Sequence, residues 1–424
     1  MRAALWLLAL FAVAVAVALF AGNNQGTVTV FWPPHRVDLS LNLVLLLLFA
    51  AFLLLHAALG ALAALFDLPR QALRWRNQQK ERAMHGSLLD GYSHLLAGRF
   101  IRARKSAETA LGQEKSLSSG GHPLATASQL RTLAHLLAAE SAQALQDRVA
   151  RDEHLKQALE QSSAREAHET REGALMRAAR WSLDDREPHA AMDWLRGLPH
   201  GAARRTQALR MKLKAARLAG RTSEALETAR LLAKHRAFSA AAAESIVRGL
   251  ASDLLDGAHD TAQLQRAWMS LEPSERLMPE LAIHAAQRLT ALGGDAHLAR
   301  DWLLPVWEQQ HELDEPLKVK LVLALQAGLD SLDGAWLARI EAAQNANPRD
   351  PTLQYLAGMA CMRRQLWGKA QQLMGQAATG LRDPNLHRNA WRSLALLAEE
   401  RGDAQAAAQA WKRAADQGEP LRTA

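Results

Sequence analysis

Cysteine is almost absent from this chain, since Cys361 is the only one among 424 residues. A single thiol excludes an internal disulfide and the paired CxxC motifs of redox and zinc sites, and the CxxCH motif that attaches haem is missing as well. The scarcity fits a reducing compartment. Cys361 lies in an apolar helical stretch, Ala357–Met362. We therefore expect it to be a small core residue and not a nucleophile.

Signatures of catalysis and of nucleotide binding are also missing. The sequence has no HExxH zinc motif and no GxGxxG fingerprint after a strand, and its glycine pairs at positions 120–121 and 293–294 are typical of turns. A formal net charge of +8 would suit a nucleic-acid partner, but no nucleic-acid-reading motif accompanies it. The sequence therefore predicts no enzyme, no catalytic or metal-binding residues and no nucleic-acid partner.

Proline and strand-like alternation are scarce, which leaves helix as the main structure. The 14 prolines mostly separate helical stretches, as at Pro123, Pro199, Pro273, Pro279, Pro348, Pro351 and Pro384. Apolar residues recur at spacings of three and four, as amphipathic helices require. Near the amino terminus, Thr27–Trp32 favours one short strand, which Pro33-Pro34 would end. We expect an all-α chain.

Two long stretches lack charge altogether. No charged side chain occurs between Arg2 and Arg36, or between Asp38 and Asp67. Each stretch holds the roughly 20 apolar residues that a helix needs to cross a bilayer. We therefore predict a two-helix transmembrane hairpin over residues 1–68, with a short periplasmic loop at about 22–40. A cleaved signal peptide is the alternative for the first stretch, although residues 19–21, Leu-Phe-Ala, form a poor cleavage site.

A basic segment follows the second stretch and predicts the orientation. The cluster, here called the membrane-proximal basic cluster, consists of Arg70, Arg74, Arg76, Lys80 and Arg82. Basic residues that flank a span stay in the cytoplasm, so both termini and the large domain are expected there. We predict a basic juxtamembrane helix over residues 69–86, which would also attract anionic lipid head groups.

One spacing returns along the rest of the chain and predicts helical repeats. Gly98, Ala103, Ala107 and Ala110 are separated by five, four and three positions. The same spacing recurs in three further sets: Gly220, Ala225, Ala229 and Leu232; Gln365, Ala370, Met374 and Ala377; and Gly402, Ala407, Trp411 and Ala414. A glycine or polar residue would turn the chain between two antiparallel helices, and the small residue after it would let the two helices approach closely.

This pattern resembles the tetratricopeptide repeat, a helix–turn–helix unit of about 34 residues. Small residues stand seven positions before three of the turns, at Gly91, Gly358 and Ala395, and aromatic residues stand two positions after two of them, at Phe100 and Trp367. We predict a tetratricopeptide-like α-solenoid, with a repeat region over residues 87–344 and a C-terminal repeat pair over 345–424. A plain helical bundle is the alternative. Most tryptophans, Trp367 and Trp411 among them, are expected to pack between helices.

The amino-terminal part resembles the HemY family, the bacterial inner-membrane proteins of haem-biosynthesis operons. The resemblance covers roughly the first 130 residues. The short segments that carry it are Ser40-Leu41, Leu68-Pro69-Arg70, Arg74-Trp75-Arg76, Arg82-Ala83, Gly91 and Gly98-Arg99-Phe100. It implies two transmembrane helices, a cytoplasmic tetratricopeptide domain and a role in a late stage of protohaem formation. The chain does not resemble the flavin-dependent porphyrinogen oxidase of the same name, because it has no GxGxxG dinucleotide-binding fingerprint after a strand.

The resemblance implies a membrane-anchored scaffold or adaptor that gathers haem-biosynthesis enzymes. Two alternatives stay open: a scaffold for another envelope process, such as lipopolysaccharide or secretion assembly, and a protein that handles porphyrin or haem directly. No cofactor is predicted, because axial haem ligation needs one or two side chains and leaves no readable spacing. The expected partners are proteins and the lipid bilayer, and the sequence gives no oligomeric state.

Overall fold

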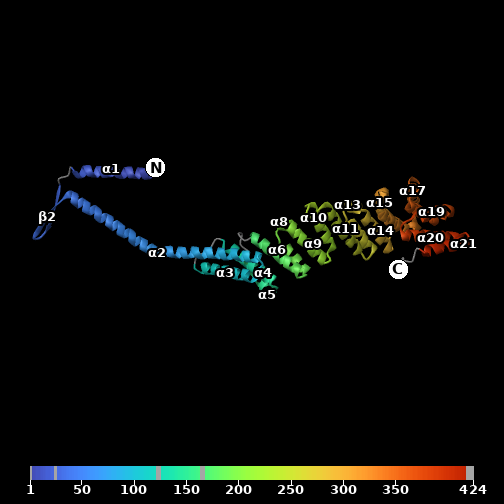
Figure 1. Cartoon of the computed structure of the whole chain (residues 1–424), viewed down its shortest axis with the longest axis horizontal. Coiled ribbons are helices and arrows are strands. Elements are labelled where there is room, and N and C mark those ends of the chain that lie inside the picture. The colour runs from blue at the N-terminus through green and yellow to red at the C-terminus, as the bar shows by residue number, and fades with distance from the viewer. Residues whose placement is uncertain (1, 23–25, 121–125, 163–167, 417–424) are drawn as a thin grey trace. The chain divides into compact units, whose positions relative to one another are not determined.

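The structure is a computed structural model that describes residues 2–22, 26–120, 126–162 and 168–416. Its contacts divide the chain into two compact units, residues 1–171 and residues 172–424, which are described separately below. Figure 1 shows the helices and strands of both units in chain order.

The chain begins with a helix and a small antiparallel sheet. Helix α1 spans Arg2–Gly22, strand β1 spans Thr27–Trp32 and strand β2 spans His35–Ser40. Thr27 pairs with Ser40 and Trp32 with His35, so the two prolines between the strands form the turn of a hairpin. The expected first strand is confirmed. The second strand was not expected, and it is held in register by a 2.6 Å hydrogen bond from Thr29 Oγ1 to Asp38 Oδ1.

Helix α2 runs without a break from Leu41 to Leu96, over 56 residues. The Ser40 hydroxyl caps it by accepting from the amide of Leu43 at 3.3 Å, which satisfies one of the free amides of its first turn. The predicted juxtamembrane segment, residues 69–86, lies within this helix, and Pro69 stands inside it. The apolar stretch and the first repeat helix are therefore parts of a single element.

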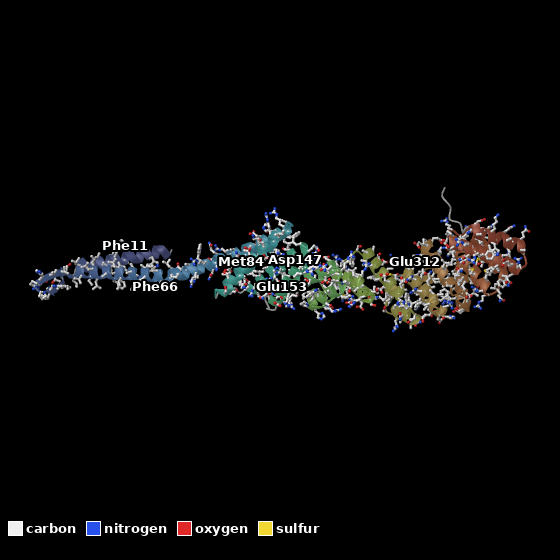
Figure 2. The ribbon with its side chains drawn as sticks, turned by 90° about the horizontal axis from the view of Figure 1, so that it is seen from below. Phe11, Phe66, Met84, Asp147, Glu153 and Glu312 are labelled. Carbon is white, nitrogen blue, oxygen red and sulfur yellow. The ribbon has the colours of Figure 1, made fainter. Side chains whose placement is uncertain are left out.

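The expected two-helix transmembrane hairpin is not supported. Among the described residues, α2 is the one helix that is long and apolar enough to cross a membrane, judged by length and composition. Helix α1 has 21 residues, but several of its side chains lie outside the described part of the chain. Apolar side chains in the charge-free part of α2 are uncovered: Leu54 is 72% exposed and Phe66, labelled in Figure 2, is 73% exposed.

The rest of the first unit consists of packed helices. They are α3 (Phe100–Ser119), α4 (Ala127–Ala144), α5 (Arg148–Gln161) and α6 (His168–Asp184), the last of which crosses into the second unit. The carboxyl-terminal part of α2 packs on α3, α3 on α4 and α4 on α5. Met84, Leu88, Ala107, Leu117 and Leu137 belong to their common core. Met84 is labelled in Figure 2 and is 2% exposed.

The second unit is a succession of helix pairs. Its elements are α7 (Pro188–Arg196), α8 (His200–Ala203), α9 (Thr206–Leu218), α10 (Thr222–Lys234), α11 (Ala240–Asp256), α12 (Thr261–Met269), α13 (Pro273–Arg276), α14 (Pro279–Ala291), α15 (Ala296–Glu308), η2 (Gln310–Glu312), α16 (Glu315–Gln326), η3 (Leu329–Ser331), α17 (Gly334–Ala346), α18 (Pro351–Arg363), α19 (Trp367–Gly380), α20 (Pro384–Glu400) and α21 (Ala404–Asp416). The two helices of a pair pack together, as in α9 with α10, α14 with α15, and α18 with α19. The first helix of one pair also contacts the first helix of the next, as α14 contacts α16 and α18 contacts α20. One core cluster continues from Leu183 to Leu397. This is the arrangement of stacked repeats.

The turns between paired helices share one backbone geometry. Among the described residues, positive φ occurs at Gly98, Gln146, Arg186, Gly220, Arg236, Gly293, Gln365 and Gly402. At the first of these turns, the amide of Arg99 donates to the carbonyl of His94, and the carbonyl of Arg99 accepts from the amide of Ala103. The first bond closes a Schellman motif, and the second opens the next helix. This double use of one residue accounts for the step of five between the turn residue and the first buried alanine.

These turns predict opposite effects for the same substitution at two glycines. Gly220 has φ +68° and open space where a Cβ would stand, so Gly220→Ala should destabilise the second unit by about 1 kcal/mol through backbone strain alone. Gly249 lies within α11, also with open space around it. Gly249→Ala should therefore stabilise by a similar amount, because alanine favours helix. Urea unfolding followed by far-ultraviolet circular dichroism measures both. An unchanged stability of Gly220→Ala would contradict the turn geometry, and a loss of stability in Gly249→Ala would contradict the helical position of Gly249.

Candidate functional site

The membrane-proximal basic cluster is presented on one helix. Arg74, Arg76 and Arg82 are exposed on α2, while the side chain of Arg70 lies outside the described residues. Lys80 is also exposed, and its ammonium group donates to Ser116 Oγ on α3 at 2.9 Å. Trp75, 61% exposed, stands among these cations. Tryptophan and basic side chains at the end of an apolar stretch are typical of a lipid–water interface.

The small residues of the repeat signature lie in the core. Ala103, Ala107, Ala225, Ala229, Ala370, Ala395 and Ala407 are all buried. A Cβ on Gly91 would stand 2.5 Å from Leu137 Cδ2, and one on Gly358 would stand 3.0 Å from Met374 Cγ. A side chain at either position would require Leu137 or Met374 to shift. These buried alanines and glycines therefore pack helices together.

Two aromatic residues of the signature differ from the expectation that tryptophans pack between helices. Trp367 is 42% exposed and Trp411 is 36% exposed. Trp367 is the first residue of α19, so it stands beside the turn and is only partly covered, and Trp411 turns its indole Nε1 toward Glu399 Oε1 at 2.7 Å. Other tryptophans do pack inside: the rings of Trp268 and Trp302 stack with their centroids 4.8 Å apart.

A cleft lined by cations opens along α9. Arg210, Lys214 and Arg217 are exposed on this helix, at intervals of four and three, so they share one side of it. They line a cavity of about 570 Å³. Its apolar side chains are Leu213, Leu218, Phe238 and Ile246. We call this cavity, with its seven lining residues, the α9–α11 cleft.

The local fold fixes the wall of this cleft. Arg236 adopts a positive φ after α10, which turns the chain so that Phe238 stands opposite α9. The Arg210 guanidinium donates to the carbonyl of Ala237 at 2.8 Å and lies 5.7 Å from the centroid of the Phe238 ring. Ser239 then caps α11 by accepting from the amide of Ala242. The arginine and the aromatic ring thus hold one another in place.

The α9–α11 cleft combines two kinds of contact. Lys214 and Arg217 carry exposed cationic groups, and Leu218 beside them is 54% exposed. Such a surface favours a ligand with a carboxylate next to an apolar or aromatic group. The sequence prediction missed this site. The spacing of the three cations along α9 was visible, but Phe238 and Ile246 come from the next turn and helix, so only the fold brings them together.

The single cysteine has the character of a core residue. Cys361 is fully buried, as predicted, and burial raises the pKa of its thiol above the ordinary value, so the thiol stays protonated at neutral pH. Within the described ranges, no group of three or more His, Cys, Asp and Glu side chains is arranged to hold a metal ion.

Comparison with known proteins gives one family match. The model described as HemY protein N-terminus matches residues 26–146, which include the sheet, α2, α3 and α4. No curated protein sequence matches the chain.

Three solved structures illustrate the fold comparison. The crystal structure titled P58(IPK) TPR domain has 13% identity over 75% of this chain and 99% of its own, with a TM-score of 0.23. The APC/C hetero-tetramer Cut9-Hcn1 has 13% identity over 77% and 64%, with a TM-score of 0.29. Naa15/Naa10 bound to HypK-THB has 11% identity over 76% and 56%, with a TM-score of 0.25. At these low scores the likeness carries no argument about partners. The family comparison is limited to one part of the chain: residues 26–146 match the N-terminal region of the HemY family.

Proposed function

We propose that this protein is a membrane-anchored scaffold of the tetratricopeptide type, which organises enzymes of late protohaem biosynthesis at the cytoplasmic face of the bacterial inner membrane. The family match at residues 26–146 is the observation that supports the pathway. The stacked helix pairs support the scaffold, because repeats of this kind present extended surfaces for protein binding. The apolar part of α2 supports the anchor.

The α9–α11 cleft suggests how a partner is held. Arg210, Lys214 and Arg217 would attract an acidic segment, and Phe238 and Leu218 would bury an apolar side chain from it. Such a segment would bind across the first helices of neighbouring repeats. The expected partners are haem-biosynthesis enzymes that act on the same membrane.

Reversing the charge of the cleft should separate binding from folding. In the triple variant Arg210→Glu, Lys214→Glu and Arg217→Glu, we expect recovery of partner proteins from mild-detergent membranes to fall at least about tenfold, because like charges replace complementary ones. The unvaried chain is expected to recover ferrochelatase or porphyrinogen oxidase. Quantitative mass spectrometry of the captured proteins measures both results.

The matched control carries the same charge change elsewhere in the second unit, at the exposed cations Arg266, Arg382 and Lys412. It should capture partners as the unvaried chain does. Recovery of lipopolysaccharide or secretion components alone, without haem enzymes, would reject the haem pathway and favour a scaffold for another envelope process. Equal capture by both triple variants would reject the cleft as the partner site.

A second candidate function is direct handling of a porphyrin. The observation that favours it is the same cleft, since its cations and apolar side chains suit the carboxylates and the flat ring of a porphyrin. Titration of the full chain in detergent with haem should then give a saturable Soret shift, which the triple charge reversal should abolish. The absence of a saturable shift at micromolar haem would count against this candidate and leave the scaffold intact.

The orientation is proposed from the exposed cations after the apolar stretch. Both termini and the repeat units are placed in the cytoplasm, in keeping with the positive-inside rule. Protease added to intact spheroplasts should therefore leave the repeat units uncut, and digestion should begin only after the membrane is permeabilised. Cleavage of these units in intact spheroplasts would reverse the proposed orientation.

A further inference from the structure

Two histidines face each other in the first unit and take no part in the repeat signature or the cleft. His135 lies on α4 and His154 lies on α5, and their Nδ1 atoms are 3.1 Å apart. The ring centroids are 5.4 Å apart with the ring planes 41° from each other. Because the centroids are farther apart than the nitrogens, the rings meet through their Nδ1 edges. Both side chains are partly buried.

The pair is uncharged at neutral pH. Burial, the His154 ring and Arg131 lower the pKa of His135 to about 4, with Glu153 acting in the opposite direction. Burial is also the largest cause that lowers the pKa of His154. Each neutral ring carries one proton, so one ring holds it on Nδ1 and donates, while the other holds its proton on Nε2 and offers an Nδ1 lone pair. Neutral imidazole is the form that binds metal ions.

The distance between the nitrogens is close to that of two imidazoles on one metal ion. Bonds of about 2.0–2.1 Å from zinc to histidine nitrogen place two tetrahedral ligands about 3.3 Å apart. The observed separation is 3.1 Å, so the nitrogens need to part only slightly. The rings must also rotate so that both lone pairs point to one place, which their partial exposure allows.

Charged groups from three helices surround the pair. Glu108 of α3 has the largest charge effect on His154, and Arg104 of α3 opposes it. Glu153 and the α5 cap Asp147, both labelled in Figure 2, add negative charge on the side of α5. Arg104 is held by Glu108 at 3.4 Å and by Asp147 at 3.1 Å. The pair thus sits beside carboxylates that can balance an added cation.

We propose that His135 and His154 form a binding site for a divalent transition-metal ion that prefers imidazole ligands, such as Zn²⁺ or Cu²⁺. The two imidazoles are the protein ligands, and water fills the remaining positions. The ion takes both Nδ1 lone pairs, and the ring that had carried its proton on Nδ1 holds it on Nε2 instead, so no proton is released at neutral pH. Bound metal would join α4 to α5.

Metal titration of the full chain tests this site. The protein is prepared in detergent without a histidine tag and is freed of metal with a chelator. Added Zn²⁺ should raise the unfolding temperature of the first unit by several degrees, because a ligand that binds only the folded state stabilises it. Added Cu²⁺ should give an electron paramagnetic resonance spectrum with hyperfine coupling to two imidazole nitrogens.

Variants assign the effect to the pair. The double variant His135→Gln and His154→Gln should lose the Zn²⁺ shift and the two-nitrogen Cu²⁺ signal, and His135→Gln alone should weaken binding at least about tenfold. His189→Gln, which removes an exposed histidine on α7, should bind as the unvaried chain does.

Circular dichroism and urea unfolding of the metal-free double variant verify that it folds. The Cu²⁺ spectrum of the unvaried chain tests the proposal even if the double variant is unstable. A copper spectrum without two imidazole nitrogens, or equal binding by the double variant, would overturn the proposal.

Discussion

Replacing Arg300 with methionine is expected to lower the free energy of unfolding of the second unit by about 1–3 kcal/mol. Arg300 is 2% exposed and is the largest of the fully buried side chains. Its Nη1 donates to the carbonyl of Gly328 at 2.7 Å and its Nη2 to the carbonyl of Ser331 at 2.9 Å. Methionine fills much of the volume but removes both donors. The buried Gly328 carbonyl would keep only a long, 3.4 Å hydrogen bond from Ser331 Oγ, and a buried group left unpaired costs about 1–3 kcal/mol.

Urea unfolding of the full chain in detergent measures this loss through the midpoint and slope of the second unit. Arg266→Met is the matched control, because Arg266 is exposed on α12 and should change stability by less than about 0.5 kcal/mol. The loss of stability is expected to be largest near Arg300. Arg300 joins α15 to the turn between α16 and α17, so amide exchange should accelerate there first. A stability equal to that of the control would show that the buried arginine contributes little.

The second large effect concerns the membrane. Leu47→Arg and Leu54→Arg together, in a chain that lacks residues 1–25, are expected to move the protein from the membrane to the soluble fraction. Each arginine at the centre of a span costs about 2.5–3.5 kcal/mol for insertion. Leu47 is 55% exposed and Leu54 is 72% exposed, so neither change removes a contact of the fold. Carbonate extraction and immunoblotting measure the distribution.

The matched control uses the same substitutions on the same helix. Leu89 is 68% exposed and Leu96 is 88% exposed, but both lie beyond the apolar stretch, so Leu89→Arg and Leu96→Arg should leave the protein in the membrane. The double variant with residues 1–25 restored tests helix α1 independently. Retention there would indicate a second anchor and support the two-span prediction. Retention of the shortened double variant would refute α2 as a span.

Most of the repeat architecture could be predicted from sequence because its signals are local. A glycine at 98, 220 or 402 marks a left-handed turn, and the alanines after it mark the buried side of the next helix. The turns at Gln146, Arg186 and Arg236 adopt the same geometry without glycine. Nothing in such side chains indicates positive φ, and so these three turns were not predicted. The second strand of the hairpin was missed because His35–Ser40 alternates too weakly.

The candidate sites could not be predicted for a different reason. Phe238 meets Arg210 only after the turn at Arg236 brings the end of α10 back to α9. His135 and His154 meet because α4 and α5 are antiparallel, and one residue of displacement along either helix would separate them. Contacts between helices determine both sites, whereas the sequence patterns describe single helices and their turns.

The unbroken course of α2 has a geometric consequence. Asp67 ends the charge-free stretch, and Met84 is the first side chain of the packed core further along. At 1.5 Å per residue, the helix rises about 25 Å between them. If α2 crosses the membrane as proposed, this length of helix would separate the first packed helices from the lipid surface by roughly the diameter of a small protein domain, measured along the helix axis. Such a separation would leave room for a small domain of a partner next to the bilayer.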